Sequence, residues 1–225
     1  MTIDGPDAHH LANVMRAQPG EQVWLFDGRG KEFVAQIEEI TKKTVLLRII
    51  DSQDTGRELD HQLTLAVALP KGDRQKVLVE KLVELGVSNL LPLNTRRSVV
   101  VANAKSTEKL QRRVIEASKQ CGRNQLMEIG QPTSFQTLIE QKAPARCRII
   151  GHPNSTPVDS IDVDVAQDVL VAIGPEGGFT DDEIELARSY GWQVATMGKT
   201  VLRVETAAVA AATIFGIGRK MLNSK

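Results

Sequence analysis

Residues 168–219 constrain the fold more than any other stretch, because they place two glycine-bearing loops directly after two strand-like segments. Val169–Ile173 reads VLVAI, a continuous apolar run typical of a short strand buried on both faces. The loop GPEGG follows at 174–178, and a second loop, GKTVLR at 198–203, follows the predicted strand Gln193–Met197. Open α/β sheets bind ligands at the carboxyl ends of their strands. We therefore expect the two loops to lie side by side and to border a ligand crevice.

The helices of this stretch carry clear boundary signals. The sequence TDDE at 180–183 is a capping box, and Phe179 with Ile184 has the spacing of a hydrophobic staple. Gly191 is placed to end this helix in a left-handed conformation. A closing helix is predicted over Glu205–Met221, and it is alanine-rich and apolar on every side. Such a helix is buried all round, either by a partner chain or within the monomer.

The two loops also have interpretations other than a ligand site. The GPEGG segment could serve only to reverse the chain, as many Gly-Pro pairs do. The residues GKT at 198–200 resemble the end of a phosphate-binding loop, but that motif requires glycine at 193, where this chain has Gln193. No G-x-G-x-x-G segment follows a predicted strand, so the sequence argues against an ordinary dinucleotide-binding fold.

Together, GPEGG after a buried strand and MGKTVLRVETA before an alanine-rich helix resemble the SPOUT class of methyltransferases. Within that class the chain is similar to the ribosomal RNA small subunit methyltransferase E family, which methylates N3 of a uridine in 16S ribosomal RNA. The resemblance extends through the segments HHLANVMR, FDGRG, KGDRQKVLVEKLVELGV and ASKQCGR. It implies an α/β fold with a C-terminal trefoil knot, an S-adenosylmethionine site inside the knot, and a homodimer.

The resemblance also indicates which residues surround the cofactor. Backbone groups of glycine-rich loops can approach an adenine edge closely, without long side chains. Met197 and Leu202 could equally pack in the core, and Glu176 could orient the cofactor amine or contact a partner subunit. The expected cofactor-binding residues are His152, Ile173, Gly174, Pro175, Glu176, Gly177, Gly178, Met197, Gly198, Val201, Leu202 and Arg203.

Two charged residues at the end of the second loop are the candidates for catalysis. Methylation of uridine N3 displaces a proton from a weakly acidic imide, so the site must stabilise a uridinate anion. Arg203 is the candidate for electrostatic stabilisation of that anion. Glu205 is the candidate proton acceptor. Glu205 could instead be structural, because a carboxylate in the first turn of a helix interacts favourably with the helix dipole.

The distribution of charge suggests a nucleic-acid surface, although the net charge is zero. Residues 71–125 contain 12 Lys and Arg against 5 Asp and Glu, and an asymmetry of this kind is typical of a phosphate-binding patch or of solvated helix faces. Aromatic residues make up only 4% of the chain, so recognition of shape and phosphate is expected rather than base stacking. The candidate RNA contacts are His10, Arg16, Lys71, Arg96, Arg97, Arg112, Arg113, Lys119 and Arg123.

The chain divides into two predicted domains, 1–60 and 61–225, at the polar segment SQDTGRELDH. Strands at Val23–Phe26, Phe33–Ile37 and Val45–Ile50 form a meander after a helical turn at His9–Arg16, which suits a small β-barrel. This barrel resembles the PUA-like RNA-binding domain of the family. The family's first strand precedes the HHLANVMR segment, and in this chain that strand is expected to be missing. His9 and His10 could contact RNA or simply pack the helical turn.

The second predicted domain alternates strands and helices, which predicts a mostly parallel sheet. The segment 151–164 is expected to be a long loop. The expected strands are Leu63–Leu69, Asn89–Leu93 and Cys147–Ile150, and the expected helices are Arg74–Leu85, Ser106–Gln120 and Thr133–Gln141.

Other patterns narrow the class of protein. No long apolar run or signal-peptide pattern occurs, so we expect a cytoplasmic protein without membrane segments. Cys121 and Cys147 lie far apart, and the four histidines lack metal-ligand spacing, so neither a disulfide nor a metal site is expected. The main hypothesis is a uridine-N3 methyltransferase acting on 16S ribosomal RNA or the small subunit. The alternatives are a SPOUT methyltransferase with another target base or ribose, and a non-catalytic RNA-binding module.

Overall fold

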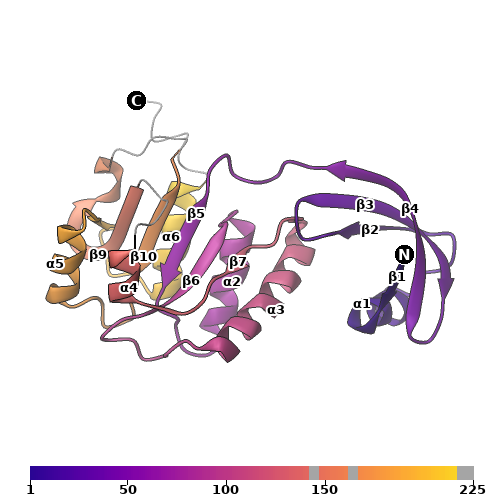
Figure 1. Cartoon of the computed structure of the whole chain (residues 1–225), viewed down its shortest axis with the longest axis horizontal. Helices are drawn as coiled ribbons and strands as arrows, with labels where there is room; N and C mark the ends of the chain where they lie inside the picture. Colours follow the sequence, from indigo (N-terminus) through magenta and orange to yellow (C-terminus); the bar gives the residue numbers. More distant parts are fainter. Residues whose placement is uncertain (142–146, 162–166, 217–225) are drawn as a thin grey trace. The chain divides into compact units, whose positions relative to one another are not determined.

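A computed structural model describes residues 1–141, 147–161 and 167–216 (Figure 1). The chain forms two compact units, Met1–Arg57 and Glu58–Lys225. The division falls where the polar segment follows the last strand of the first unit.

The first unit is a four-stranded antiparallel sheet with the order β1-β4-β3-β2. Its strands are β1 Thr2–Asp4, β2 Gln22–Phe26, β3 Lys31–Ile40 and β4 Thr44–Asp54. The three predicted strands are present. Strand β1 precedes the HHLANVMR segment, where no strand was expected, because three residues are too few for a periodic pattern. Helix α1 Gly5–His9 continues into the π-helical turn His10–Val14, and Ala8 and Leu11 pack against the inward residues of the sheet.

The second unit is built on a seven-stranded sheet with the order β11-β9-β10-β5-β6-β7, in which β8 also pairs with β6. Its strands are β5 Leu63–Val67, β6 Asn89–Asn94, β7 Glu128–Ile129, β8 Thr133–Ser134, β9 Cys147–Pro157, β10 Val169–Ile173 and β11 Gln193–Thr196. Every pairing among the described strands of this sheet is parallel. The predicted α/β class with a mostly parallel sheet is confirmed.

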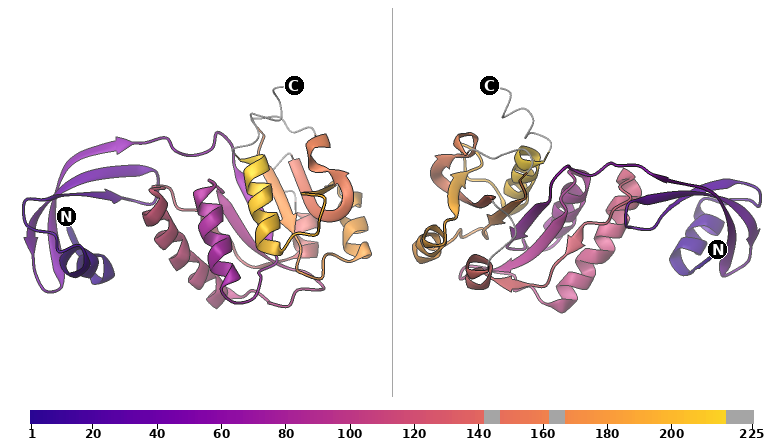
Figure 2. Two further views of the ribbon diagram at one scale, coloured as in Figure 1. Left: turned by 180° about the vertical axis from the view of Figure 1, so that it is seen from behind. Right: turned by 45° about the horizontal axis from the view of Figure 1, so that its top comes forward.

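Helices cover both faces of this sheet. The helices are α2 Arg74–Glu84, α3 Ala104–Cys121, α4 Phe135–Glu140, α5 Asp181–Ser189 and α6 Val204–Phe215. Helices α3, α2 and α6 lie side by side over one face, as Figure 2 shows. Helices α4 and α5 pack against the other face. None of the helices in the described ranges is long and apolar enough to cross a membrane.

Strand β10 shows why the sequence VLVAI is apolar throughout. Val169, Val171 and Ile173 belong to the core under α2, α3 and α6, whereas Leu170 and Ala172 belong to the core under α4 and α5. The strand pairs with β5 on one side and β9 on the other. Alternate residues therefore enter opposite cores, and the predicted burial on both faces is confirmed.

Two expectations about the C-terminal half need correction. Strand β9 continues to Pro157 and is followed by a 3-10 turn at Val158–Ser160, so the segment 151–164 is not simply a loop. Helix α6 begins at Val204 and ends at Phe215, and the predicted continuation to Met221 lies outside the described residues. The trefoil knot implied by the resemblance stays a prediction.

Candidate functional site

A pocket of about 290 Å³ opens at the carboxyl ends of β9, β10 and β11. Its walls are three backbone segments, 151–154, 173–179 and 196–202, completed by Arg97, Val204 and Ala207. Each segment follows or interrupts one strand of the parallel sheet. The position agrees with the general rule that open α/β sheets bind ligands at this edge.

An irregularity in β9 contributes the middle wall. Val194 of β11 pairs with Ile150, but the next residue, Ala195, pairs with Thr156. Residues 151–155 therefore form an irregularity against β11, although Gly151 still pairs with Ile173 of β10, and His152 of this segment lines the pocket. Because β9 lies between β10 and β11, the two loops are not on neighbouring strands as expected, although both border the same pocket.

The first loop, Gly174–Phe179, is fastened to the protein at several points. The Arg97 guanidinium Nη1 donates hydrogen bonds to the carbonyl oxygens of Gly177, at 2.8 Å, and of Phe179, at 3.4 Å. The amide of Gly178 donates to the carbonyl of Pro175 at 2.8 Å, which closes a tight turn. Phe179 is buried, and the predicted capping box and staple of α5 are present.

The second loop, Met197–Arg203, is far more exposed. Its start is held by Thr196, whose Oγ1 donates to the carbonyl of Gly198 at 2.7 Å. Its end is the first turn of α6, where the amide of Ala207 donates to the carbonyl of Arg203. Between them Val201 is 78% exposed although it lines the pocket.

The pocket collects eleven of the twelve residues that the sequence assigned to the cofactor. The exception is Arg203, the N-cap residue of α6, which is exposed and lies between the lining residues Leu202 and Val204. Its backbone is extended, with φ −65° and ψ 156°. Arg203 thus lies beside the lining residues rather than among them, and it is exposed to solvent.

Glu205 lies in the first turn of α6 and does not line the pocket. Its side chain is only 12% exposed, and its Oε2 makes no hydrogen bond to any residue that the structure describes. Arg74 Nη1 lies 3.9 Å from this oxygen, and Arg74 Nη2 lies 2.9 Å from Oε1 of the pocket residue Glu176. Arg74 was not predicted as a site residue. The sequence placed it at the start of the helix that follows the buried strand β5, and β5 pairs with β10, so its position could have indicated that it lies near the site.

His152 places an imidazole in the pocket wall. Its Nδ1 is buried and has no hydrogen-bond partner among the described residues. Burial lowers the pKa of His152 below its ordinary value; nearby Asp181 opposes this change, and Arg188 adds to it. The ring is therefore neutral at pH 7 and offers an unsatisfied nitrogen to a ligand.

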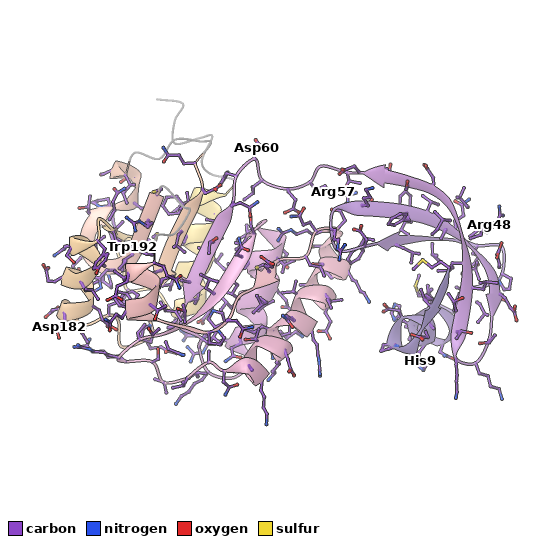
Figure 3. The ribbon with its side chains drawn as sticks, viewed as in Figure 1. His9, Arg48, Arg57, Asp60, Asp182 and Trp192 are labelled. Carbon is purple, nitrogen blue, oxygen red and sulfur yellow. The ribbon has the colours of Figure 1, made fainter. Side chains whose placement is uncertain are left out.

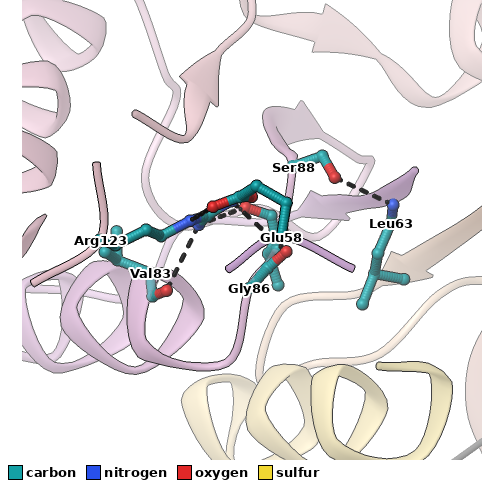
Figure 4. Close-up of polar contacts among 7 residues, drawn as sticks. Glu58, Leu63, Val83, Gly86, Ser88 and Arg123 are labelled. Atoms are coloured by element: carbon teal, nitrogen blue, oxygen red, sulfur yellow. Dashed lines mark hydrogen bonds and ion pairs between the residues drawn. The ribbon is translucent and has the colours of Figure 1, made fainter. Parts of the chain in front are cut away.

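Arg123, predicted as an RNA contact, is instead a structural residue. Its side chain is buried and forms a bidentate ion pair with Glu58 (Figure 4). The same guanidinium donates to the carbonyls of Val83 and Val87, at the end of α2. A cation at the carboxyl end of a helix is favourable, and these contacts leave Arg123 no access to phosphate.

Arg97, another predicted RNA contact, is exposed and also holds the first loop, and its contact with RNA stays a prediction. Arg96 is exposed and forms an ion pair with Asp182, which projects from the first turn of α5 (Figure 3). Arg113 is half-buried, and its Nη1 is enclosed and has no hydrogen-bond partner in the described ranges. The remaining candidates are exposed: Lys71, Arg112 and Lys119 in the second unit, and His10 and Arg16 in the first.

Within residues 1–141, 147–161 and 167–216, no group of three or more His, Cys, Asp or Glu side chains is placed to hold a metal ion. Cys121 is exposed and Cys147 is buried, and neither forms a disulfide in the described part of the chain.

Comparison with known families gives two matches. Residues 57–216 match the model of an RNA methyltransferase domain, and residues 3–50 match that of an RNA methyltransferase PUA domain. The ribosomal RNA small subunit methyltransferase E of Synechocystis sp. is 32% identical over 216 residues, covering 94% of this chain and 71% of that protein. The Bacillus subtilis protein of the same name is 28% identical, with 98% of this chain and 91% of that protein covered.

Solved structures agree with these matches. Ribosomal RNA small subunit methyltransferase E from Neisseria gonorrhoeae, bound to S-adenosyl methionine, superposes with a TM-score of 0.85 and 32% identity over 95% of this chain and 90% of that chain. A Legionella pneumophila protein described as a methyltransferase, in complex with the same cofactor, gives a TM-score of 0.88 and 36% identity over 96% and 91% of the two chains.

Proposed function

We propose that this chain, which belongs to the ribosomal RNA small subunit methyltransferase E family, methylates N3 of a uridine in 16S ribosomal RNA. It is a methyltransferase that uses S-adenosylmethionine, as its relatives with bound cofactor do. The observation that carries the proposal is the pocket, where eleven residues assigned from the family motifs meet at one edge of the sheet.

The pocket fits such a cofactor chemically. Glycine backbone in both loops allows close approach of an adenine and a ribose. The free Nδ1 of His152 offers a hydrogen bond, and the Glu176 carboxylate offers a negative charge to a cationic ligand. S-adenosylmethionine supplies an electrophilic methyl group on its sulfonium. The chain must therefore assist loss of the uridine N3 proton and stabilise the charge that develops on the base.

We assign the charge stabilisation to Arg203. Arg203 is exposed and lies in the chain between Leu202 and Val204, which both line the pocket. A base placed against the methyl group would spread negative charge over two ring carbonyls, which a guanidinium stabilises electrostatically. This position suits a group that contacts the target base rather than the cofactor.

Glu205 is the proposed proton acceptor, and its contact with Arg74 supports a structural role as the competing interpretation. The substitution Glu205→Gln keeps the shape and removes the base. If Glu205 accepts the proton, the variant is slow at neutral pH and recovers as rising pH ionises the uridine; single-turnover rates from about pH 6.5 to 9.5 measure this. Rates equal to wild type across that range, with a lowered melting temperature, would assign Glu205 to structure.

The exposed basic residues of α3 are the proposed phosphate contacts of the second unit. Replacing both Arg112 and Lys119 with Ala should reduce the slope of log affinity for RNA against log salt by about two, because each phosphate contact contributes about one. Lys81→Ala, on an exposed position of α2 paired with Glu84, is the control and should leave the slope unchanged. An unaltered slope in the double variant would make the α3 residues solvated charges only.

A homodimer in the cytoplasm completes the proposal. Ala208, Ala211 and Ala212 of α6 are fully buried within the monomer. Val209 and Ile214 are apolar and partly exposed on the same helix, so a second copy could cover them. Light scattering after size exclusion measures the mass, and a monomer at micromolar concentration would reject the dimer.

One experiment tests the function directly. The protein is incubated with isotope-labelled S-adenosylmethionine and unmodified 16S ribosomal RNA, free or assembled into small subunits, and the nucleosides are analysed by mass spectrometry. The expected product is 3-methyluridine. A label on another base or on ribose would favour a different SPOUT activity, and binding of cofactor and RNA without transfer would favour a non-catalytic RNA-binding module.

A further inference from the structure

Arg74 connects three parts of the second unit that are distant in sequence. It is the first residue of α2, while Glu176 belongs to the first loop and Glu205 to the first turn of α6. One guanidinium nitrogen lies 2.9 Å from Glu176 Oε1, and another lies 3.9 Å from Glu205 Oε2. A single cation thus stands between a pocket carboxylate and the carboxylate next to the proposed catalytic arginine.

The position of Arg74 on its helix is unfavourable by itself. A positive charge at the amino end of a helix opposes the helix dipole, and the first turn of α2 carries no acidic residue to offset it. The Asp73 side chain makes no capping hydrogen bond either. The carboxylates that lie near the Arg74 guanidinium, Glu176 and Glu205, come from outside α2, so its ion pairs serve those groups.

The carboxylates need a shared cation for a separate reason. Glu205 is 12% exposed, and its Oε2 has no hydrogen-bond partner in the described part of the chain. Two carboxylates near one site repel each other, and a uridinate formed beside them adds a third negative charge. A planar guanidinium presents several donors in a fixed fork and can face two carboxylates at once, which an ammonium group cannot do equally well.

We propose that Arg74 is a positioning residue of the methyltransferase: its guanidinium holds Glu176 of the cofactor loop and Glu205 of α6 in one arrangement, so that the bound methyl donor and the start of α6 are aligned. This inference rests on the proposed function for its effect on rate. Its effect on cofactor affinity can be measured without RNA.

The first test compares three variants on the same helix. Arg74→Ala should weaken S-adenosylmethionine binding about fivefold and reduce the saturating single-turnover rate about tenfold or more, since misalignment affects rate strongly. Arg74→Lys should recover part of the affinity and less of the rate, because one ammonium pairs with one carboxylate. Lys76→Ala, an exposed residue of α2 paired with Glu80, is the matched control and should match wild type. Melting curves accompany each variant.

A double-mutant cycle distinguishes positioning from general destabilisation. Calorimetry gives the cofactor affinities of Arg74→Ala, Glu176→Gln and the double variant. If the pair acts together, the double variant binds no worse than about twofold below the weaker single variant. Losses that multiply would overturn the proposal. Where Arg74→Ala fails to fold, the same cycle is completed with Arg74→Lys.

The outcomes separate this inference from the function on which it rests. Wild-type protein that binds cofactor but transfers no methyl group to any RNA would end the proposed function, while a coupled cycle would still place Arg74 in support of the cofactor loop. Wild-type transfer together with uncoupled affinities would leave the function intact and remove Arg74 from the site.

Discussion

The loops Gly174–Phe179 and Met197–Arg203 border the same pocket but are held by the protein in different ways. Arg97, which follows β6, and Arg74, the first residue of α2, both contact the first loop, and Phe179 is buried in the core. The second loop extends through exposed residues between β11 and α6. The first loop is therefore shaped during folding, whereas the second has fewer contacts to define it before a ligand binds.

This difference has an energetic consequence. A loop that is already ordered loses little conformational entropy on binding, so it can contribute most of the cofactor affinity. An open loop that ends in Arg203 can adjust to a second substrate. We expect changes in the first loop to appear mainly in cofactor affinity and changes at the end of the second mainly in rate.

The largest expected effect is that of Gly178→Val. Gly178 has φ +67°, a left-handed conformation that costs an L-residue about 1–2 kcal/mol and a β-branched residue more. Nothing lies within 4 Å of an added Cβ, so the strain falls on the loop and not on the core. Calorimetry should show cofactor affinity reduced about a hundredfold or more in a folded protein. Gly177→Ala, whose Cβ would contact only the Arg97 side chain at 3.4 Å, should cost a few-fold at most. Unchanged binding by Gly178→Val would remove this loop from the cofactor site.

Arg203→Ala should show most clearly that the second loop affects the rate rather than the cofactor affinity. The side chain is exposed and not part of the pocket wall, so the cofactor dissociation constant should stay within about twofold. The single-turnover rate should fall about a hundredfold, as for loss of one preorganised electrostatic donor. An equal fall in cofactor affinity would contradict the assignment of affinity to the first loop and of rate to the second.

Arg97→Ala should leave the first loop with fewer contacts to the rest of the protein, as in the second loop. The change removes charge-assisted hydrogen bonds to two backbone carbonyls, and we expect about a tenfold loss of cofactor affinity. Arg96→Ala is the control for this measurement, because its ion pair with Asp182 is exposed and contributes little. Equal affinities for the two variants would show that the Arg97 hydrogen bonds to the first loop do not contribute to cofactor binding.

The smallest effect concerns His152, which lies between the loops. Burial lowers its pKa, so the ring is neutral at pH 7 and becomes charged only as the pH falls through that lowered value. The cationic cofactor should then bind more weakly by a few-fold, while affinity stays constant above pH 7. Calorimetry from about pH 5 to 8 measures this, and His152→Asn should flatten the profile. The same pKa also predicts lower stability on acidification, since the unfolded chain takes up the proton more readily.

Local sequence determined much of this protein. The run VLVAI, the TDDE capping box and the glycines of GPEGG each specify their element through burial, capping or backbone freedom, and each is found where expected. Very short strands such as β1 and β7 were not predictable, because two or three residues carry no periodicity. The bulge of β9 was missed because the partner strand imposes its register.

The roles of the arginines were decided only by the tertiary structure. In the sequence, Arg97, Arg112 and Arg123 are equivalent members of one basic segment. In the fold, Arg97 donates hydrogen bonds to the first loop and Arg112 is exposed. Arg123 pairs with Glu58 and donates to a carbonyl in the last turn of α2. Local patterns encode where a helix or strand begins, but the partner of a long charged side chain depends on which segments the fold brings within its reach.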